Sequence, residues 1–280
     1  MEAEPVMTVG FWESAWDAAT SKSNVPELIL NIKSLWDTRV RGFQEERSVE
    51  RVAAVRDLLD QANMLDKGKT FLDVGCGTGS FVLALKDRFR KTTAFDCSGA
   101  ALSILREKAH DCHNIEIIQG DINNCELTET YDVVLGSLNP ALYNQRAFKT
   151  ILGLCQDTLI YVGRSTPLPE PKGEDELGVL LLGKQLHSAG SNHVLYPIGL
   201  LMALGYQPQL AHVSYTHVRK ERREEAIGRL NSQYRNYAVK AKDPEKVITA
   251  FVDERLEDGW YVDRAPRTFG IVLCKLTHGE

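Results

Sequence analysis

The chain has 280 residues, of which 43% are hydrophobic and 25% charged, and its formal net charge is −5. These fractions are ordinary for a soluble globular protein. The negative balance gives no overall field that would draw the chain to nucleic acid or to anionic lipid. The longest apolar runs, near 177–186 and 194–204, contain Gly, Pro or Lys and fall short of a bilayer span. We therefore expect neither a nucleic-acid partner nor a membrane partner.

The six cysteines are scattered without a C-x-x-C pair, and the acidic N-terminus has no signal-peptide pattern. Reduced thiols in the cytoplasm are the simplest interpretation, so we expect a cytoplasmic protein. The histidines show no recognised metal-ligand spacing, and no metal site is expected. A chain of this length holds one large domain, or one domain with an added substrate cover.

Residues 1–43 are rich in aromatic side chains, which argues against a disordered tail. These side chains either pack N-terminal helices onto the core or form a lid whose aromatic faces suit a cationic ligand. Residues 44–65 follow with apolar side chains at helical spacing and predict a helix that ends at Lys67 and Gly68. The aromatic residues of the leader are Phe11, Trp12, Trp16, Trp36 and Phe43.

The stretch from Thr70 to Leu85 organises the rest of the chain. Its apolar start predicts a buried strand, which is followed by a turn through Gly75, Gly77 and Gly79 and then by an amphipathic helix. A strand, a glycine turn and a helix form the first half of a nucleotide-binding unit in a doubly wound sheet. Glycines let the backbone approach a ligand, and the helix start offers free N–H groups.

The spacing of the glycines separates two ligand classes. The dinucleotide fingerprint requires G-x-G-x-x-G, whereas this chain has G-x-G-x-G with Ser80 at the position of the third glycine. Asp73, two residues before the first glycine, suits a ligand with a positively charged amine. The run L-D-V-G-C-G-T-G resembles the first motif of the class I S-adenosylmethionine-dependent methyltransferases, here of the small-molecule type. The resemblance implies S-adenosylmethionine as the cofactor and S-adenosylhomocysteine as its product.

Acidic residues follow the next two predicted strands. Residues 91–96 end at Asp96, about 20 residues past the glycines, where an acid can accept both ribose hydroxyls. Residues 115–121 end at Gly120-Asp121, and the resemblance implies that Asp121 and Ile122 meet the adenine amino edge. The predicted cofactor-binding residues are Asp73, Gly75, Cys76, Gly77, Gly79, Asp96, Cys97, Asp121, Ile122 and Ser137.

Four more strands complete the predicted sheet: residues 131–140 hold the fourth strand and its exit loop, and the others lie at 157–163, 209–218 and 268–275. Their order resembles the class I methyltransferase architecture, so we expect an α/β fold with a doubly wound, seven-stranded, mostly parallel sheet. In that architecture the last strand inserts antiparallel. Predicted helices lie at 99–110, 144–156, 175–189 and 193–204.

We divide the chain into an N-terminal helical lid (1–65), a cofactor-binding core (66–164) and a region with the remaining strands and helical insertions (165–280). A loop with Pro167, Pro169 and Pro171 leaves the core. The charged stretch 219–246 predicts partly helical structure with a solvated face. We interpret the long excursion before the last strand as a substrate cover or as a subunit contact of a homo-oligomer.

The acceptor and the catalytic residues are less clearly marked. Asn139-Pro140 leaves the fourth strand, but the amine-targeting motif Asn/Asp-Pro-Pro-aromatic is incomplete, since Tyr143 comes one place late. Tyr143, His187 and His193 are candidates for a base, and Asn139 is a candidate for binding an amine. We predict methyl transfer to a small molecule. The alternatives are a protein or nucleic-acid methyltransferase, a catalytically silent cofactor-binding module and, with a different cofactor, a dehydrogenase.

Overall fold

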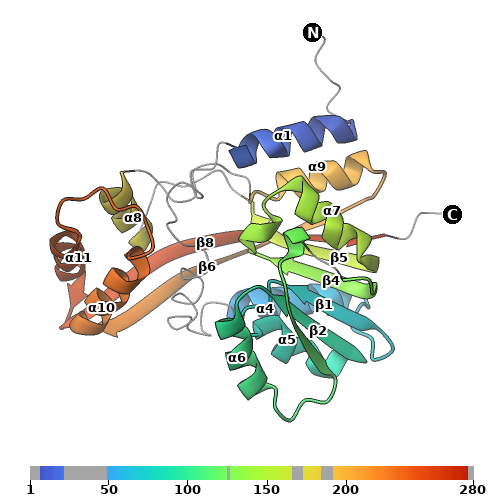
Figure 1. Ribbon diagram of the computed structural model, residues 1–280, viewed down its shortest axis with the longest axis horizontal. Helices are drawn as coiled ribbons and strands as arrows, with labels where there is room; N and C mark the ends of the chain where they lie inside the picture. Colours follow the sequence, from blue (N-terminus) through green and yellow to red (C-terminus); the bar gives the residue numbers. More distant parts are fainter. Residues whose placement is uncertain (1–6, 22–48, 125–126, 166–172, 184–191, 277–280) are drawn as a thin grey trace, which may run out of the picture.

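The computed structural model describes residues 7–21, 49–124, 127–165, 173–183 and 192–276. These residues form one eight-stranded sheet in the order β3-β2-β1-β4-β5-β8-β6, and β7 pairs with β8 (Figure 1). The first five strands are parallel to one another, whereas β8 runs antiparallel to both β5 and β6. The strands are β1 Thr70–Val74, β2 Lys91–Asp96, β3 Ile115–Gln119, β4 Tyr131–Ser137, β5 Cys155–Arg164, β6 Gln209–Arg222, β7 Leu256–Glu257 and β8 Trp260–Lys275.

The predicted α/β fold and the inserted antiparallel strand are confirmed. The seven predicted strands are present, and the two-residue β7 is an addition that the sequence did not reveal. The helices are α1 Val9–Ser21, α4 Val49–Gln61, α5 Ser80–Leu85, α6 Gly99–Lys108, α7 Gln145–Gly153, α8 Glu174–Leu182, α9 Leu195–Ala203, α10 Arg223–Tyr234 and α11 Pro244–Asp253. Short 3-10 turns are η2 Lys86–Arg88, η3 Ile122–Asn124 and η4 Pro140–Leu142.

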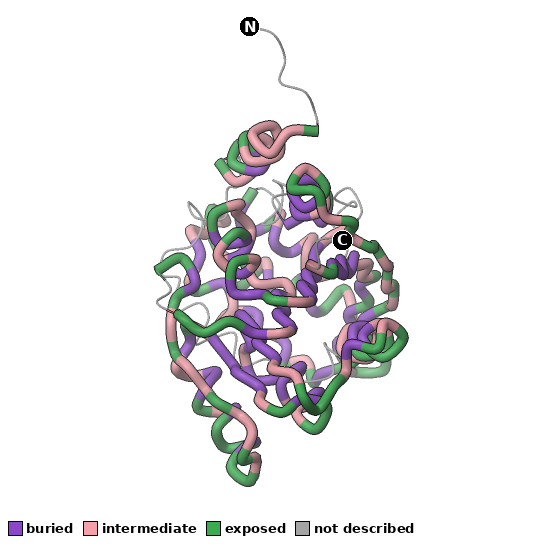
Figure 2. The backbone as a smooth tube through the Cα atoms, turned by 90° about the vertical axis from the view of Figure 1, so that its right-hand side faces the viewer, coloured by how far each residue is buried: buried purple, intermediate pink, exposed green. Residues whose placement is uncertain are grey.

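Helices cover both faces of the sheet, as a parallel sheet with apolar strands requires. α4, α5 and α6 lie on one face, and α1, α7 and α9 lie on the other (Figure 1). The buried segments concentrate at the centre of the molecule, between these layers (Figure 2). None of the helices in the described ranges is long and apolar enough to cross a membrane.

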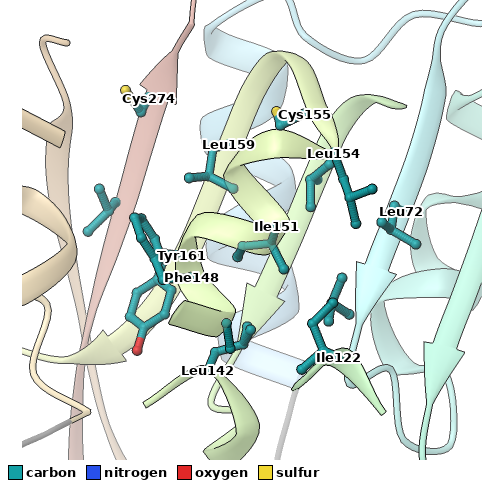
Figure 3. Packing of buried hydrophobic residues seen from close by; sticks show 14 of the residues in the cluster. Leu72, Ile122, Leu142, Phe148, Ile151, Leu154, Cys155, Leu159, Tyr161 and Cys274 are labelled. Atoms are coloured by element: carbon teal, nitrogen blue, oxygen red, sulfur yellow. The ribbon is translucent and has the colours of Figure 1, made fainter. Parts of the chain in front are cut away.

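The aromatic leader contributes to the core through α1. Trp16 is fully buried, and its ring lies 5.7 Å from that of Tyr196 and 5.3 Å from that of Phe148. Phe148 in turn meets the ring of Tyr161 edge-on in the cluster of Figure 3. Trp16 therefore makes core contacts, one of the two roles that the sequence left open. Trp36 and Phe43 lie outside the described residues, and the lid over residues 1–65 stays a prediction.

Two strands extend farther than the sequence predicted. β6 continues to Arg222 instead of ending at 218, and β8 begins at Trp260 instead of 268. The two strands form a long antiparallel ribbon that carries α8, α10 and α11 away from the main sheet (Figure 1). We call these three helices with the ribbon end the distal lobe. It has its own apolar core, built from Leu177, Leu181, Leu182, Ala226, Leu230, Tyr234, Tyr237, Ile248, Phe251, Val252 and Tyr261.

The prediction of a solvated helical face over residues 219–246 is wrong in part. Residues 219–222 belong to β6, and the inward-facing Arg219 and Glu221 are buried. Arg229 Nη2 donates to Glu174 at 2.6 Å, and its Nε donates to Glu221 Oε2 at 2.9 Å. Burial alone would raise the pKa of Glu221, but the hydrogen bonds and charges of Arg229 and Arg219 outweigh it and lower the pKa. Charged side chains are buried here because they satisfy one another.

We expect Arg229→Ala to lower the free energy of unfolding by roughly 2–4 kcal/mol, because it removes the arginine that donates to Glu174, which is also one of the two arginines that pair with the buried Glu221. The control is Arg264→Ala, which removes a pair with Glu257 on the surface and should leave the denaturation midpoint nearly unchanged. Chemical denaturation measures both variants. Equal losses in the two would contradict the account of the buried network.

Candidate functional site

The predicted acids lie at the carboxyl edge of the parallel strands. Register places Asp73 of β1 between Ala94 of β2 and Leu135 of β4, so the ends of these strands are level. Asp96 ends β2, Ser137 ends β4, and Asp121 lies two residues beyond β3. Because β1 and β4 are neighbours while the chain order reverses between them, this edge is the topological switch point where open α/β sheets bind ligands.

The glycine turn has the backbone conformation that the sequence predicted. Gly75, Gly77 and Gly79 all have positive φ angles, of 79°, 55° and 86°. A Cβ on Gly75 would lie 2.4 Å from the Asn139 amide nitrogen, whereas a Cβ on Gly77 would meet nothing within 4 Å. The turn is therefore packed against the protein at Gly75 and open at Gly77. The open side faces away from the packed core and leaves room for a ligand against the backbone.

Asp96 fixes the position of this turn. Its Oδ2 accepts the Gly77 N–H at 2.9 Å, and its Oδ1 accepts the Ser98 N–H at 2.8 Å. The carbonyl of Phe95 also accepts the N–H of Gly75 at 2.7 Å. The end of β2 thus holds the loop that follows β1, and the half-buried Asp96 carboxylate stays at the crevice edge.

Asp73 is a buried acid with an unused oxygen. It is 2% exposed, and its Oδ2 has no hydrogen-bond partner within the described ranges. Burial raises the pKa of Asp73 to about 8, and the charge of Asp96 adds to the rise. Arg51 opposes the rise, and its guanidinium carbon lies 5.8 Å from the ring centres of both Phe81 and Phe269. An acid kept partnerless in this position suits a ligand that brings a cation to it.

The remaining predicted cofactor residues surround the same edge. Cys97 is exposed just after β2, and Ile122, the first residue of η3, is buried in the core. Asp121 Oδ1 accepts the N–H of Asn123 at 2.9 Å, so the acid also starts η3. Cys76 is buried, and burial raises the pKa of its thiol well above the usual range. The Ser137 hydroxyl is buried with no partner among the residues that the structure describes.

The catalytic candidates are placed differently from one another. Asn139 Nδ2 donates to the Val74 carbonyl at 3.3 Å, and its Oδ1 accepts the Ala141 N–H at 3.0 Å. Both ends of this amide are therefore used to join the β1 and β4 loops. The Tyr143 phenol acts electrostatically on Arg51, Tyr161 and Arg164, so it lies in the neighbourhood of these three side chains. His187 lies outside the described residues.

His193 is poorly suited to be a base. Its Nδ1 lies 3.0 Å from the Leu195 N–H at the start of α9 and accepts that hydrogen bond. We infer that the neutral ring carries its proton on Nε2, which leaves no free lone pair. Burial also lowers the pKa of His193. Within the described ranges no three His, Cys, Asp or Glu side chains are grouped to hold a metal.

Two arginines of this site, Arg51 and Arg164, were not predicted from the sequence. Arg51 is one of several charged residues in a predicted helix, and nothing in the sequence indicates that its charge acts on Asp73. Arg164 directly follows the predicted fifth strand, at the edge where ligands bind in such sheets. Its position at a strand end was the one signal that could have identified it.

Residues 71–159 match the family model of a methyltransferase domain. This segment is a class I methyltransferase domain. Its cofactor is S-adenosylmethionine, as the glycine loop predicts, and the partnerless Asp73 oxygen and the open side of Gly77 fit such a ligand. Because the match covers the glycine turn, Asp96, Asp121 and Ser137, it includes the crevice edge described above.

Three curated relatives share this domain. The cypemycin N-terminal methyltransferase of Streptomyces is 38% identical over 26% of this chain and 29% of its own length. The (S)-tetrahydroprotoberberine N-methyltransferase of Eschscholzia californica is 27% identical over 33% and 28%. A Methanosarcina mazei protein assigned as ribosomal RNA small subunit methyltransferase A is 28% identical over 37% and 35%. The chain spans about a third of the length of these relatives, and their names refer to three different acceptors: cypemycin, (S)-tetrahydroprotoberberine and ribosomal RNA.

Among solved structures, the YcgJ protein of Bacillus subtilis aligns with 80% of this chain and 98% of its own. The TM-score is 0.54 and the sequence identity is 12%. At this identity the likeness shows the fold alone. The alignment leaves the activity of the whole chain to be tested by experiment.

The raised pKa of Asp73 predicts a pH dependence of stability. When the pKa of an acid in the folded state exceeds its unfolded value of about 3.9, the free energy of unfolding falls as the pH rises between the two values. The reason is that the folded state holds a proton there that the unfolded state has already released. We expect Asp73→Asn to remove this fall in the ligand-free protein. The melting temperature of the variant, minus that of the wild type, should therefore increase from pH 4 to pH 8 and then level off. A difference that is flat over this range would contradict the burial of a partnerless acid.

Proposed function

We propose that the chain transfers the methyl group of S-adenosylmethionine to a small-molecule acceptor at the carboxyl edge of β1, β4 and β5. The observation that carries this proposal is the open side of Gly77 between two acids, Asp73 and Asp96. A turn that only joined a strand to a helix would need neither the open backbone nor a buried acid without a partner.

The residues at the edge supply partners for each part of the cofactor. We assign Asp96 to the ribose hydroxyls, and Asp121 with the backbone of Ile122 to the adenine. The partnerless Oδ2 of Asp73 would accept from the amino group, and its ionised form would then be favoured. Arg51, whose Nε is buried without a partner in the described structure, would hold the carboxylate of the same amino-acid tail. The amino and carboxylate groups of this zwitterionic tail would thus compensate the charges of Asp73 and Arg51, which are otherwise poorly compensated.

The chemistry places modest demands on the protein. When bound, the sulfonium of the cofactor supplies an activated methyl group with a good leaving group. Holding the acceptor lone pair in line with that methyl can contribute about 7–11 kcal/mol to lowering the barrier. If the acceptor enters protonated, Tyr143 is the candidate base in the neighbourhood of Arg51 and Arg164, whereas His193 uses its free nitrogen to cap α9.

The small-molecule acceptor, the cover and the compartment are parts of the proposal. The negative net charge favours a small molecule over RNA, although one relative is assigned to ribosomal RNA. The lid of residues 1–65 and the helices of 165–205 would enclose the acceptor, and the free cysteines of the described ranges agree with a reducing cytoplasm. The distal lobe would serve as a substrate cover or as a contact between subunits.

Gly77→Val should abolish S-adenosylhomocysteine binding, because its side chain enters the space against the backbone that the ligand requires. The matched control is Gly205→Val: Gly205 also has a positive φ and open space where a Cβ would lie, but it belongs to the turn after α9. Both variants should be strained to a similar degree and stay folded. Isothermal titration calorimetry separates them, and equal affinities would contradict the loop assignment.

The acceptor class can be tested with methyl-labelled S-adenosylmethionine and a cell extract divided into small-molecule, protein and RNA fractions. We expect label in a small-molecule product. Asp96→Ala should reduce labelling at least tenfold at limiting cofactor, because it removes the ribose acceptor and the Gly77 bond. The exposed Asp87→Ala is the control. Label found only in the RNA or protein fraction would contradict a small acceptor.

A further inference from the structure

A second cation lies at the crevice, separate from the one beside Asp73. Arg164 ends β5, and its backbone is fixed on both sides. Its N–H donates to the Asn192 carbonyl at 2.9 Å, and its carbonyl accepts the Val194 N–H at 2.7 Å. Register places Arg164 beside Phe269 of β8. The guanidinium therefore extends from a rigid position at the carboxyl edge of the sheet.

The charge of Arg164 is poorly compensated. The guanidinium is half-buried, and within the described ranges it makes no hydrogen bond or ion pair. The acid whose charge acts on Arg164, Asp175, already accepts from Arg267 Nη1 at 3.2 Å. Burial lowers the pKa of Arg164, the charge of Asp175 opposes this, and Arg267 adds to the lowering. Two arginines thus share one carboxylate, and burying a cation in this way is costly unless a ligand compensates it.

Two buried hydroxyl groups without partners in the described structure flank this cation in the chain, and the alternation of side chains along β5 puts both on the face opposite to Arg164. Tyr161 Oη and Ser165 Oγ are both buried and unpartnered in the described structure. Tyr143 links the two faces of the edge, since its phenol interacts electrostatically with both Tyr161 and Arg164. The end of β5 therefore offers a guanidinium on one face and hydroxyl donors on the other, beside β4, where an acceptor would lie next to the cofactor.

We propose that the methyl acceptor is an organic anion, a carboxylate or a phosphate ester, whose charged group is bound by Arg164. This inference rests on the proposed function, because it concerns the acceptor side of the same site. The charges of Arg51 and Asp73 act on each other, and Arg51 is assigned to the cofactor tail, whereas the charges that act on Arg164 are those of Asp175, Tyr143 and Arg267. A planar guanidinium matches both anions through two parallel N–H bonds. The acceptor atom then lies at the end of the molecule away from this charge.

The test uses three probes of similar size that differ in charge: benzoate, phenyl phosphate and benzamide. Each is titrated by calorimetry into the protein saturated with S-adenosylhomocysteine. We expect at least one of the two anions to bind about tenfold more tightly than benzamide, and the preferred anion distinguishes a carboxylate from a phosphate ester. Arg164→Gln should abolish this preference while its affinity for S-adenosylhomocysteine stays unchanged. Arg56→Gln, an exposed arginine of α4, is the matched control and should keep the preference.

Two results would overturn the inference alone: S-adenosylhomocysteine binds but neither anion is preferred over benzamide, or Arg164→Gln keeps the preference. Failure of all three probes to bind at millimolar concentration would also overturn the inference alone. Failure of the wild-type protein to bind S-adenosylhomocysteine would instead overturn the proposed function, and this inference with it.

Discussion

The hydrogen bonds of Asp96 hold the site together. One carboxylate oxygen accepts from Gly77 at 2.9 Å and the other accepts from Ser98 at 2.8 Å. The first bond positions the glycine turn, and the second fixes the start of the helix after β2. An acid on one strand thus sets the shape of the loop that follows its neighbour. The parallel register brings the two strand ends level and makes this contact available.

The same edge concentrates groups that are costly for the ligand-free fold. Among the residues that the structure describes, Asp73 is buried with an unpartnered oxygen, and Arg51 and Arg164 are cations without a hydrogen-bonded acid. In the distal lobe Arg229 is paired with Glu174 and Glu221, although the buried Asp263 of the ribbon end keeps one oxygen without a partner in the described structure. The two regions therefore differ at these arginines: the charge of Arg229 is compensated within the distal lobe, whereas Arg51 and Arg164 at the crevice have no such pair among the described residues.

Local patterns in the sequence were sufficient for the central sheet and the glycine turn. Apolar runs predict buried strands, and the lack of a side chain at Gly75, Gly77 and Gly79 permits the positive φ angles that they adopt. The lengths of β6 and β8 were underestimated because the alternation of buried and exposed side chains continues through charged residues. Arg219 and Glu221 face inward toward Arg229. Because both residues are charged, their hydropathy predicted a solvent-exposed position for them, and that prediction was wrong. The start of α11 had a recognisable signal in Asp243, which caps the helix, and Pro244. The position of Arg51 depends on contacts between distant segments, which one sequence does not encode visibly, whereas Arg164 directly follows the predicted fifth strand and could have been identified there.

The most direct test is a crystal structure of the protein grown with S-adenosylhomocysteine. The account predicts the ribose at Asp96, the adenine beside Asp121 and the amino-acid tail between Asp73 and Arg51. A crevice that stays empty at saturating ligand, or a ligand bound away from the glycine turn, would contradict it.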